Sequence, residues 1–212
     1  MQDTRVAPVG AGRVALGGGM APARHRGADL LVEAALHIGV DDGLELQGKL
    51  SSVQGAELGF KLALDERGPV RLSLLGGAQL ATVVVDMAGE GFSNTRTVAG
   101  VHAIPLFGFV LTDGLELVVG PDAQVGTKSG ASRFDPWFGI GARAAIALDL
   151  GTSLTFIPEC SVLLVAAGPP TRPGKYNAPR DRTVPDAVFT RGDVRLQCGA
   201  SFNFGRAYAE VE

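Results

Sequence analysis

Hydrophobic and polar residues alternate along most of this chain. In the cleanest stretch, residues 56–65, Leu58 and Phe60 have one parity, whereas Glu57 and Lys61 have the other. A period of two is typical of a β-strand whose two faces meet different surroundings. The pattern predicts ten strands, at 12–20, 29–40, 44–52, 55–65, 70–84, 96–111, 115–128, 137–149, 153–166 and 193–205.

The alternation is less regular in three of these segments. Leu75, Val101 and Ile157 interrupt it in the predicted strands 70–84, 96–111 and 153–166. In the third, fourth, eighth and tenth segments, by contrast, one face carries no charged residue.

The charges indicate how neighbouring strands pair. Directly opposed residues of an antiparallel hairpin have a constant sum of residue numbers. With Val53 at the tip, Glu45 lies opposite Lys61 and Lys49 opposite Glu57. Both are opposite-charge pairs on one face, which favours this register. A shift by one residue would lose both pairs and move every apolar side chain to the other face.

Two similar hairpin turns support the same arrangement. Residues 41–43 (Asp-Asp-Gly) and 112–114 (Thr-Asp-Gly) each fit a three-residue turn with a left-handed glycine at the end. The first turn places Gln47 beside His37 on the polar face. The second turn places Gln124 beside His102 in the same way.

The connections between the predicted strands mostly alternate in length. They are short at 41–43, 66–69, 112–114 and 150–152, and long at 21–28, 85–95, 129–136 and 167–192. Strands with short turns at one end and mostly long loops at the other predict an all-β, antiparallel up-and-down barrel. We expect the barrel at 12–205, an N-terminal tail at 1–11 and a C-terminal tail at 206–212.

Composition narrows the class of protein. The chain has 212 residues, enough for one domain, with 30 Gly, 19% charged and 6% aromatic residues. Its apolar content and low charge argue against disorder. There is no continuous apolar run of about 20 residues, as a membrane-spanning helix requires. A net charge of −3 gives no reason to expect a nucleic-acid partner.

Alternation alone does not decide which face is outside. A soluble barrel that binds an apolar ligand would place its apolar side chains inside, and a membrane barrel would place them outside. The apolar face nearly lacks Lys and Glu, and the polar face combines charges with many glycines, as a narrow interior requires. The strands are also long enough to cross hydrocarbon, which takes about 9–11 residues. We therefore expect a transmembrane β-barrel in contact with a lipid bilayer, and keep the soluble barrel as an alternative.

The last predicted strand carries a further signal. Gln197, Gly199, Phe202 and Phe204 form a polar–glycine–aromatic–aromatic pattern that resembles the assembly signal of bacterial outer-membrane β-barrel proteins. The resemblance covers residues 12–205 in its strand and turn plan, although residues 205–212 continue past the aromatic position where that family often ends. It implies an outer-membrane location, periplasmic termini and the barrel-assembly machinery as a partner. A removed secretion signal would then account for the start of the chain, which lacks one.

The polar face supplies a set of charges for the barrel interior. We expect them to pair into a network that plugs a narrow lumen, because an unpaired buried charge is costly. An ion or proton path is the alternative. The predicted network consists of Glu33, Glu45, Lys49, Glu57, Lys61, Arg71, Glu116, Arg143, Glu159 and Arg195.

Other candidate chemistry is sparse. Cys160 and Cys198 share the apolar face of the last two strands. The sum of their residue numbers corresponds to a hairpin register in which they could lie opposite each other. We expect free thiols that face lipid, with a disulfide as the alternative. The three histidines are scattered, so we expect no metal site. No histidine approaches a serine nucleophile, so we expect neither catalysis nor a cofactor.

The long loop at 167–192 carries exposed chemistry. Its basic and aromatic residues could bind a phosphorylated lipid head group, such as that of lipopolysaccharide, or a protein partner, or stay solvated. They are Arg172, Lys175, Tyr176, Arg180 and Arg182. The sequence therefore predicts a non-enzymatic outer-membrane anchor or scaffold that presents its loops to an adhesion, motility or export assembly. A small pore with a charged lumen is the second hypothesis.

Overall fold

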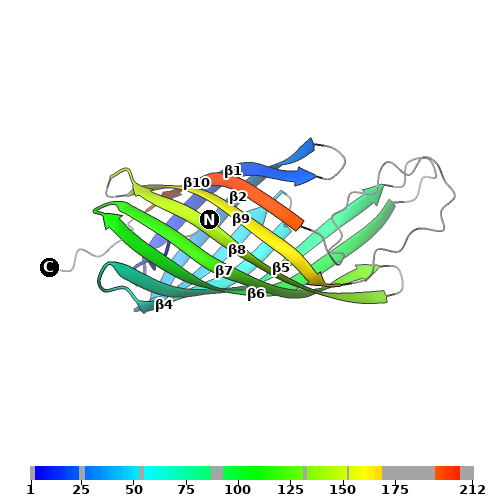
Figure 1. Cartoon of the computed structure of the whole chain (residues 1–212), viewed down its shortest axis with the longest axis horizontal. Coiled ribbons are helices and arrows are strands. Elements are labelled where there is room, and N and C mark those ends of the chain that lie inside the picture. Colours follow the sequence, from blue (N-terminus) through cyan, green and yellow to red (C-terminus); the bar gives the residue numbers. More distant parts are fainter. Residues whose placement is uncertain are drawn as a thin grey trace.

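The chain forms a closed β-barrel (Figure 1). The computed structural model describes residues 3–23, 27–52, 55–86, 93–130, 133–151, 153–168 and 194–205. All neighbouring strands are antiparallel, and β1 closes the barrel against β10. The strands are β1 (Gly12–Ala23), β2 (Gly27–Asp41), β3 (Leu44–Ser51), β4 (Gly55–Asp65), β5 (Val70–Asp86), β6 (Ser93–Thr112), β7 (Leu115–Gly130), β8 (Arg133–Asp149), β9 (Leu154–Ala167) and β10 (Val194–Phe204).

The predicted fold and strand pairing are confirmed. Each of the ten predicted segments corresponds to one observed strand. Most of the observed strands are a few residues longer than predicted. Glu45 lies opposite Lys61 and Lys49 opposite Glu57. The other predicted pairs, His37 with Gln47 and His102 with Gln124, also lie side by side.

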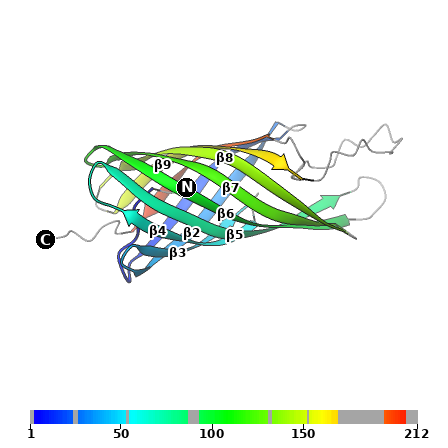
Figure 2. The same ribbon diagram turned by 60° about the horizontal axis from the view of Figure 1, so that its bottom comes forward.

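The short turns after β2, β4, β6 and β8 share one end of the barrel, which lies on the left in Figure 1 and in the turned view of Figure 2. We name this the turn end and the opposite one the loop end. Gly43 and Gly114 adopt φ values of 79° and 83°, which confirms the predicted left-handed glycines. A register shift precedes each of these turns, between Gly39 and Asp41 and between Val110 and Thr112.

Large apolar side chains cover the outside of the barrel. Each strand exposes at least one of them, and Leu30 and Leu58 reach 72% and 74% exposure. Water would make such a continuous apolar surface unfavourable, whereas hydrocarbon matches it. A closed barrel also satisfies its backbone hydrogen bonds without water, as the bilayer core demands. The barrel is therefore of the transmembrane kind.

Phenylalanines gather on the outer surface towards the turn end. Phe202 packs against Phe156, with ring centroids 4.9 Å apart, and lies 6.5 Å from Phe204. Phe107 and Phe109 on β6 are exposed at the same end, opposite Leu72 and Val70. Membrane barrels carry aromatic girdles at the interfaces. Phenylalanines on β6, β9 and β10 thus lie at the level of one such girdle, whereas Phe138 is exposed in the half of β8 towards the loop end and Trp137 is buried inside.

The segment before β1 differs from the prediction. The sequence indicates a tail outside the barrel at residues 1–11, but the structure buries Asp3, Thr4, Arg5 and Ala7 inside it. The sequence pattern does not predict this burial, because the segment lacks alternation and most of its partners, such as Lys61, Glu116 and Asp149, lie on strands distant in sequence. The predicted C-terminal tail at 206–212 lies outside the described residues.

The cysteines also differ from the prediction. The predicted register is correct, since Cys198 lies directly opposite Cys160 on the outward face of β9 and β10. The expectation of free thiols is wrong, because the two residues form a disulfide. Their Cα atoms are 4.1 Å apart, which brings the sulfurs together across the strand pair.

Within the described residues, no helix has the length and apolar character needed to cross a membrane.

Candidate functional site

The interior of the barrel is the candidate site. The ten charged residues predicted for it all have the inward parity of their strands, and they are buried or partly buried. The structure divides most of them between two ionic networks. The turn-end network contains Glu45, Lys61, Arg71 and Glu116, and the mid-barrel network contains Glu33, Lys49, Glu57, Arg143 and Glu159. Arg195 faces inward on β10 opposite Leu163.

Glu45 on β3 is the centre of the turn-end network. One carboxylate oxygen lies 2.6 Å from Arg13 Nη2, and the other lies 2.8 Å from His37 Nδ1 and 3.5 Å from Lys61 Nζ. The carboxylate is completely buried, as is the Lys61 side chain. Each charge therefore depends on its neighbours instead of on water.

The N-terminal segment completes this network. Arg5 donates two parallel hydrogen bonds to Asp149 on β8, at 2.8 and 2.7 Å. Asp3 lies 3.2 Å from Arg13 Nη1 and 3.3 Å from Lys61 Nζ. Thr4 donates a hydrogen bond to Glu116 on β7. The segment thus contacts opposite walls of the barrel.

The surroundings of Asp3 favour its charged form. Burial alone would raise the pKa of this carboxyl, but the positive charges of Arg13, Lys61 and Arg5 lower the pKa below its ordinary value. Asp3 therefore stays ionised at neutral pH, as the balance of the network requires.

Two inward-facing glycines make room for the segment. A Cβ atom on Gly39 would lie 2.1 Å from the Pro8 carbonyl oxygen and 2.2 Å from that of Ala7. A Cβ atom on Gly108 would collide with Glu116 and would lie 2.6 Å from Thr4 Oγ1. The wall of the barrel is therefore shaped to accept this piece of chain.

The mid-barrel network is looser. Lys49 Nζ lies 2.7 Å from Glu57 and 3.9 Å from Glu33. Arg143 lies 3.1 Å from Asp122 and 3.7 Å from Glu159. These side chains keep roughly a tenth to a fifth of their surface exposed, except for the more buried Glu57 and Asp122.

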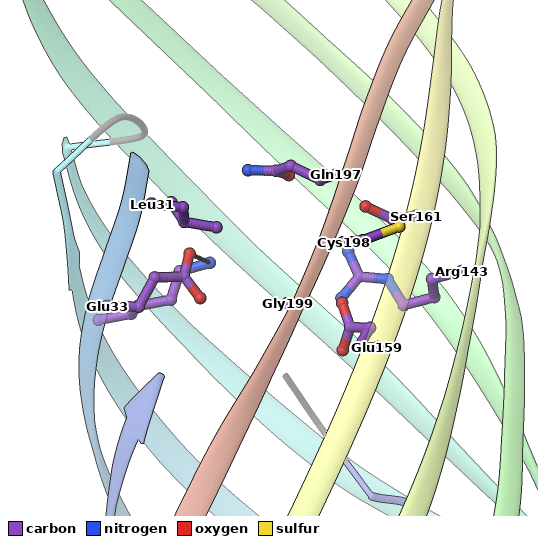
Figure 3. Close-up of a pocket in the computed structure, with 9 residues that line it drawn as sticks. Leu31, Glu33, Arg143, Glu159, Ser161, Gln197, Cys198 and Gly199 are labelled. Atoms are coloured by element: carbon purple, nitrogen blue, oxygen red, sulfur yellow. Dashed lines mark ion pairs between the residues drawn. The ribbon is translucent and has the colours of Figure 1, made fainter. Parts of the chain in front are cut away.

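A small polar cavity adjoins this network. Its volume of ≈ 40 Å³ is of the order that water molecules occupy. In Figure 3, Glu33 and Arg143 approach the cavity from opposite sides, and Ser161 and Gln197 also line it. Glu159 lies next to Arg143 in the same view. The cavity is lined by charges of both signs, so it is suited to hold water between ions.

Apolar clusters occupy other levels of the interior. The inward-facing Leu75 and Ile157, which interrupt the sequence pattern, pack in one cluster with Ile104, Leu106 and Val118. The single tryptophan, Trp137, faces inward and packs with Val98, Leu163 and Val165 in a second cluster. The interior is therefore less polar than the sequence indicates.

The remaining predicted residues have other locations. Gln197 and Gly199 of the proposed assembly signal line the cavity, whereas Phe202 and Phe204 are exposed on the outside. The predicted loop contacts, Arg172, Lys175, Tyr176, Arg180 and Arg182, lie outside the described residues. Sequence reasoning missed Asp3, Thr4 and Arg5, for which no periodic signal exists.

The comparisons with known proteins give distant structural likenesses. No family model and no curated protein matches the chain. Among solved structures, Neisserial surface protein A has 8% identity and a TM-score of 0.44, covering 92% of this chain and 95% of its own. An outer membrane channel from Pseudomonas putida F1 has 12% identity and a TM-score of 0.44, covering 97% and 98%. OmpT, an outer membrane protein of Vibrio cholerae, has 10% identity and a TM-score of 0.34, covering 97% and 98%.

The chain's own structure defines its class. A closed antiparallel barrel and an apolar outer belt with phenylalanines towards one end are features of a bacterial outer-membrane β-barrel protein. Short turns occupy the periplasmic end in this class and longer loops the outer end. By this rule the turn end, where residues 12 and 205 lie, would face the periplasm.

Proposed function

We propose that this protein is a non-conducting membrane anchor whose outer loops hold a partner at the cell surface. The observation that carries the proposal is the filled interior. The N-terminal segment and the turn-end network occupy one end, and the mid-barrel network and the apolar clusters occupy further levels. An interior used for packing leaves the outer surface and the loops as the working parts.

Barrel size supports this view. About eight strands leave an interior that side chains can fill, whereas water-filled porins have about 16. A barrel of ten strands is slightly wider than the first kind. Here residues 3–7 add their own bulk to the interior at the turn end.

The proposed partner contacts come from the sequence alone. Arg180 and Arg182 belong to a loop rich in arginine and proline, and guanidinium groups bind phosphates with paired hydrogen bonds. The loop would therefore suit lipopolysaccharide or an acidic surface of an envelope protein complex. Insertion of the barrel into the outer membrane would depend on the barrel-assembly machinery, which would recognise the polar–glycine–aromatic–aromatic pattern of β10.

Ion conductance tests the proposal. We expect the purified barrel to produce no discrete current steps in planar lipid bilayers at neutral pH. An established outer-membrane porin, reconstituted identically, serves as the positive control. Reproducible unitary steps would contradict the anchor role.

The loop contacts need a separate measurement. We expect the double change Arg180→Glu and Arg182→Glu to weaken binding to lipopolysaccharide micelles severalfold while the barrel stays folded. Changing two exposed residues of the turn end, Asp42→Asn and Asp113→Asn, is the matched control. Unchanged binding after the charge reversal would refute the proposed loop contact.

A small pore is the second candidate, because charges of both signs surround the mid-barrel cavity. If current steps occur, Arg143→Gln should change their cation-to-anion selectivity, since Arg143 lines this cavity. Steps of unchanged selectivity would point to a path that avoids it.

A further inference from the structure

The N-terminal segment is attached to the barrel in the manner of a bound peptide. Among its described residues, 3–11, it makes one isolated bridge to a strand, between Val9 and Gly39, with backbone hydrogen bonds of Gly10 and Ala11 to Gly39, and it takes part in no strand ladder. Its deeper residues, 3–7, are held mainly by side chains that project from strands distant in sequence. The walls of the barrel are closed without it, because β1 pairs directly with β2 and β10.

The residues that receive the segment form a socket at the turn end. We define it by the groups that contact residues 3–7 or give them space: Arg13, Gly39, Glu45, Lys61, Gly108, Glu116 and Asp149.

The socket is specific for the order of charges along the segment. Its basic side, formed by Arg13 and Lys61, takes the Asp3 carboxylate at 3.2 and 3.3 Å. Its acidic side takes the Arg5 guanidinium, through the two parallel bonds to Asp149. Such paired hydrogen bonds fix direction as well as charge. An acid must therefore precede a base by two residues.

Backbone and hydroxyl contacts add to this recognition. The Ala7 amide donates a 2.9 Å hydrogen bond to Glu45, and the Thr4 hydroxyl bonds to Glu116. Gly39 admits the backbone at Ala7 and Pro8. Shape and polar contacts thus both match the socket to the six consecutive residues 3–8.

Leaving the socket empty would unbalance it. Without Asp3, the buried cations Arg13 and Lys61 each lose one of the carboxylates they contact and keep that of Glu45. Without Arg5, Asp149 loses its bidentate partner. A second peptide with the same order of charges would restore both pairs.

We propose that the turn end of the barrel is a binding socket for an extended peptide with an acid–hydroxyl–base sequence, and that residues 3–7 occupy it as an exchangeable plug. The partner is a protein on the periplasmic side that exposes such a segment. This site is at the opposite end from the outer loops and does not depend on their role.

Thiol labelling of the full-length chain tests the exchange. Val6→Cys places a thiol of similar size in the buried part of the plug, and Val9→Cys is the exposed control, since Val9 is 57% exposed. The native cysteines are bonded to each other and do not react. We expect a membrane-impermeant maleimide to label Val6→Cys at least ~100-fold more slowly than Val9→Cys, because labelling then requires local opening.

Competing peptides supply the specific readout. An attached plug has an effective concentration in the millimolar range, so the peptides are used at about 10 mM. The peptides are added to a Val6→Cys chain that also carries Arg5→Gln. This second change removes the guanidinium group that bonds to Asp149, and it should by itself speed labelling of Val6→Cys about tenfold. We expect the peptide Asp-Thr-Arg-Val-Ala-Pro to speed it severalfold more. The peptide Arg-Thr-Asp-Val-Ala-Pro, with equal composition, should have no effect.

Two changes in the wall separate exchange from misfolding. Gly39→Ala places a methyl group against Pro8 and should speed labelling, whereas Gly48→Ala on the outward face should not. The Trp137 fluorescence of each variant reports a folded interior. Equal responses to the two peptides, no response to either, or rapid labelling of Val6→Cys without peptide would each overturn the proposal.

Discussion

The two ionic networks inside the barrel are built by different means. In the turn-end network, Glu45 and Lys61 are fully buried, and a segment outside the sheet supplies two of the charges. In the mid-barrel network, strand residues pair mainly across neighbouring strands, and Lys49 remains 19% exposed beside a water-sized cavity. The centre of the first network excludes water, although Arg71 and Asp149 at its edge keep 24% and 20% of their side chains exposed, and the second network retains room for water.

This difference determines how much each network contributes to stability. A buried ion that loses its partner keeps its desolvation cost, whereas a partly wet ion recovers hydration. We therefore expect substitutions at the turn end to be severe and those in the mid-barrel network to be mild. The following changes are ordered by the size of the expected effect.

Replacement of the central turn-end carboxylate should have the largest effect. Glu45→Gln keeps the shape but removes one of the two carboxylates that Arg13 and Lys61 share, the other being Asp3, so we expect a loss of about 3–5 kcal/mol in the free energy of unfolding. Urea unfolding in lipid vesicles, followed by Trp137 fluorescence, measures it. Asp113→Asn in an exposed turn is the control and should change little. Similar losses for the two variants would contradict the inferred role of burial.

Removal of the disulfide should have the next largest effect. It joins Cys160 and Cys198 over a sequence separation of 38, and cross-links of this kind typically contribute about 2–4 kcal/mol. Reductant should lower the urea midpoint of the native chain by a corresponding amount, and should leave a Cys160→Ser, Cys198→Ser chain unaffected. Labelling of Val6→Cys at the turn end should be equally slow in the Cys160→Ser, Cys198→Ser chain, in which residue 6 carries the thiol that is labelled. Faster labelling there would show that the two parts of the barrel are not independent.

Acid should weaken the turn end through Asp3. The pKa of Asp3 is lowered in the folded protein, so its stabilising contribution is complete above the unfolded value of about 3.9 and is lost as pH falls towards the folded value. We expect the native chain to lose about 2 kcal/mol more than an Asp3→Asn chain between pH 5 and pH 2. Unfolding by urea at several pH values measures this difference. If both chains lost the same free energy of unfolding between pH 5 and pH 2, Asp3 would not be the cause of the acid sensitivity.

The same contrast explains what the sequence could predict. The pairs Lys49–Glu57 and Glu45–Lys61 follow from strand register, because directly opposed residues must have one constant sum. The contacts of Asp3 with Lys61 and of Arg5 with Asp149 do not follow, because their segment has no period and these partners are 58 and 144 residues away. Register also placed Cys160 opposite Cys198, but it carried no information on the bond between them. Leu75 and Ile157 appeared as irregularities because one interior face holds both ion pairs and apolar clusters.

The mildest change should be in the mid-barrel network. Glu33 lies 3.9 Å from Lys49, which keeps its closer partner, Glu57, at 2.7 Å. We expect Glu33→Gln to cost less than about 1 kcal/mol, because the pair is long and next to a cavity of water size. Glu57→Gln should cost more, and the double change should exceed the sum of the two, since Lys49 then loses both of these carboxylates. Additive losses would show that water in the cavity already solvates Lys49. A loss from Glu33→Gln as large as that from Glu45→Gln would remove the distinction between a sealed network and a wet one.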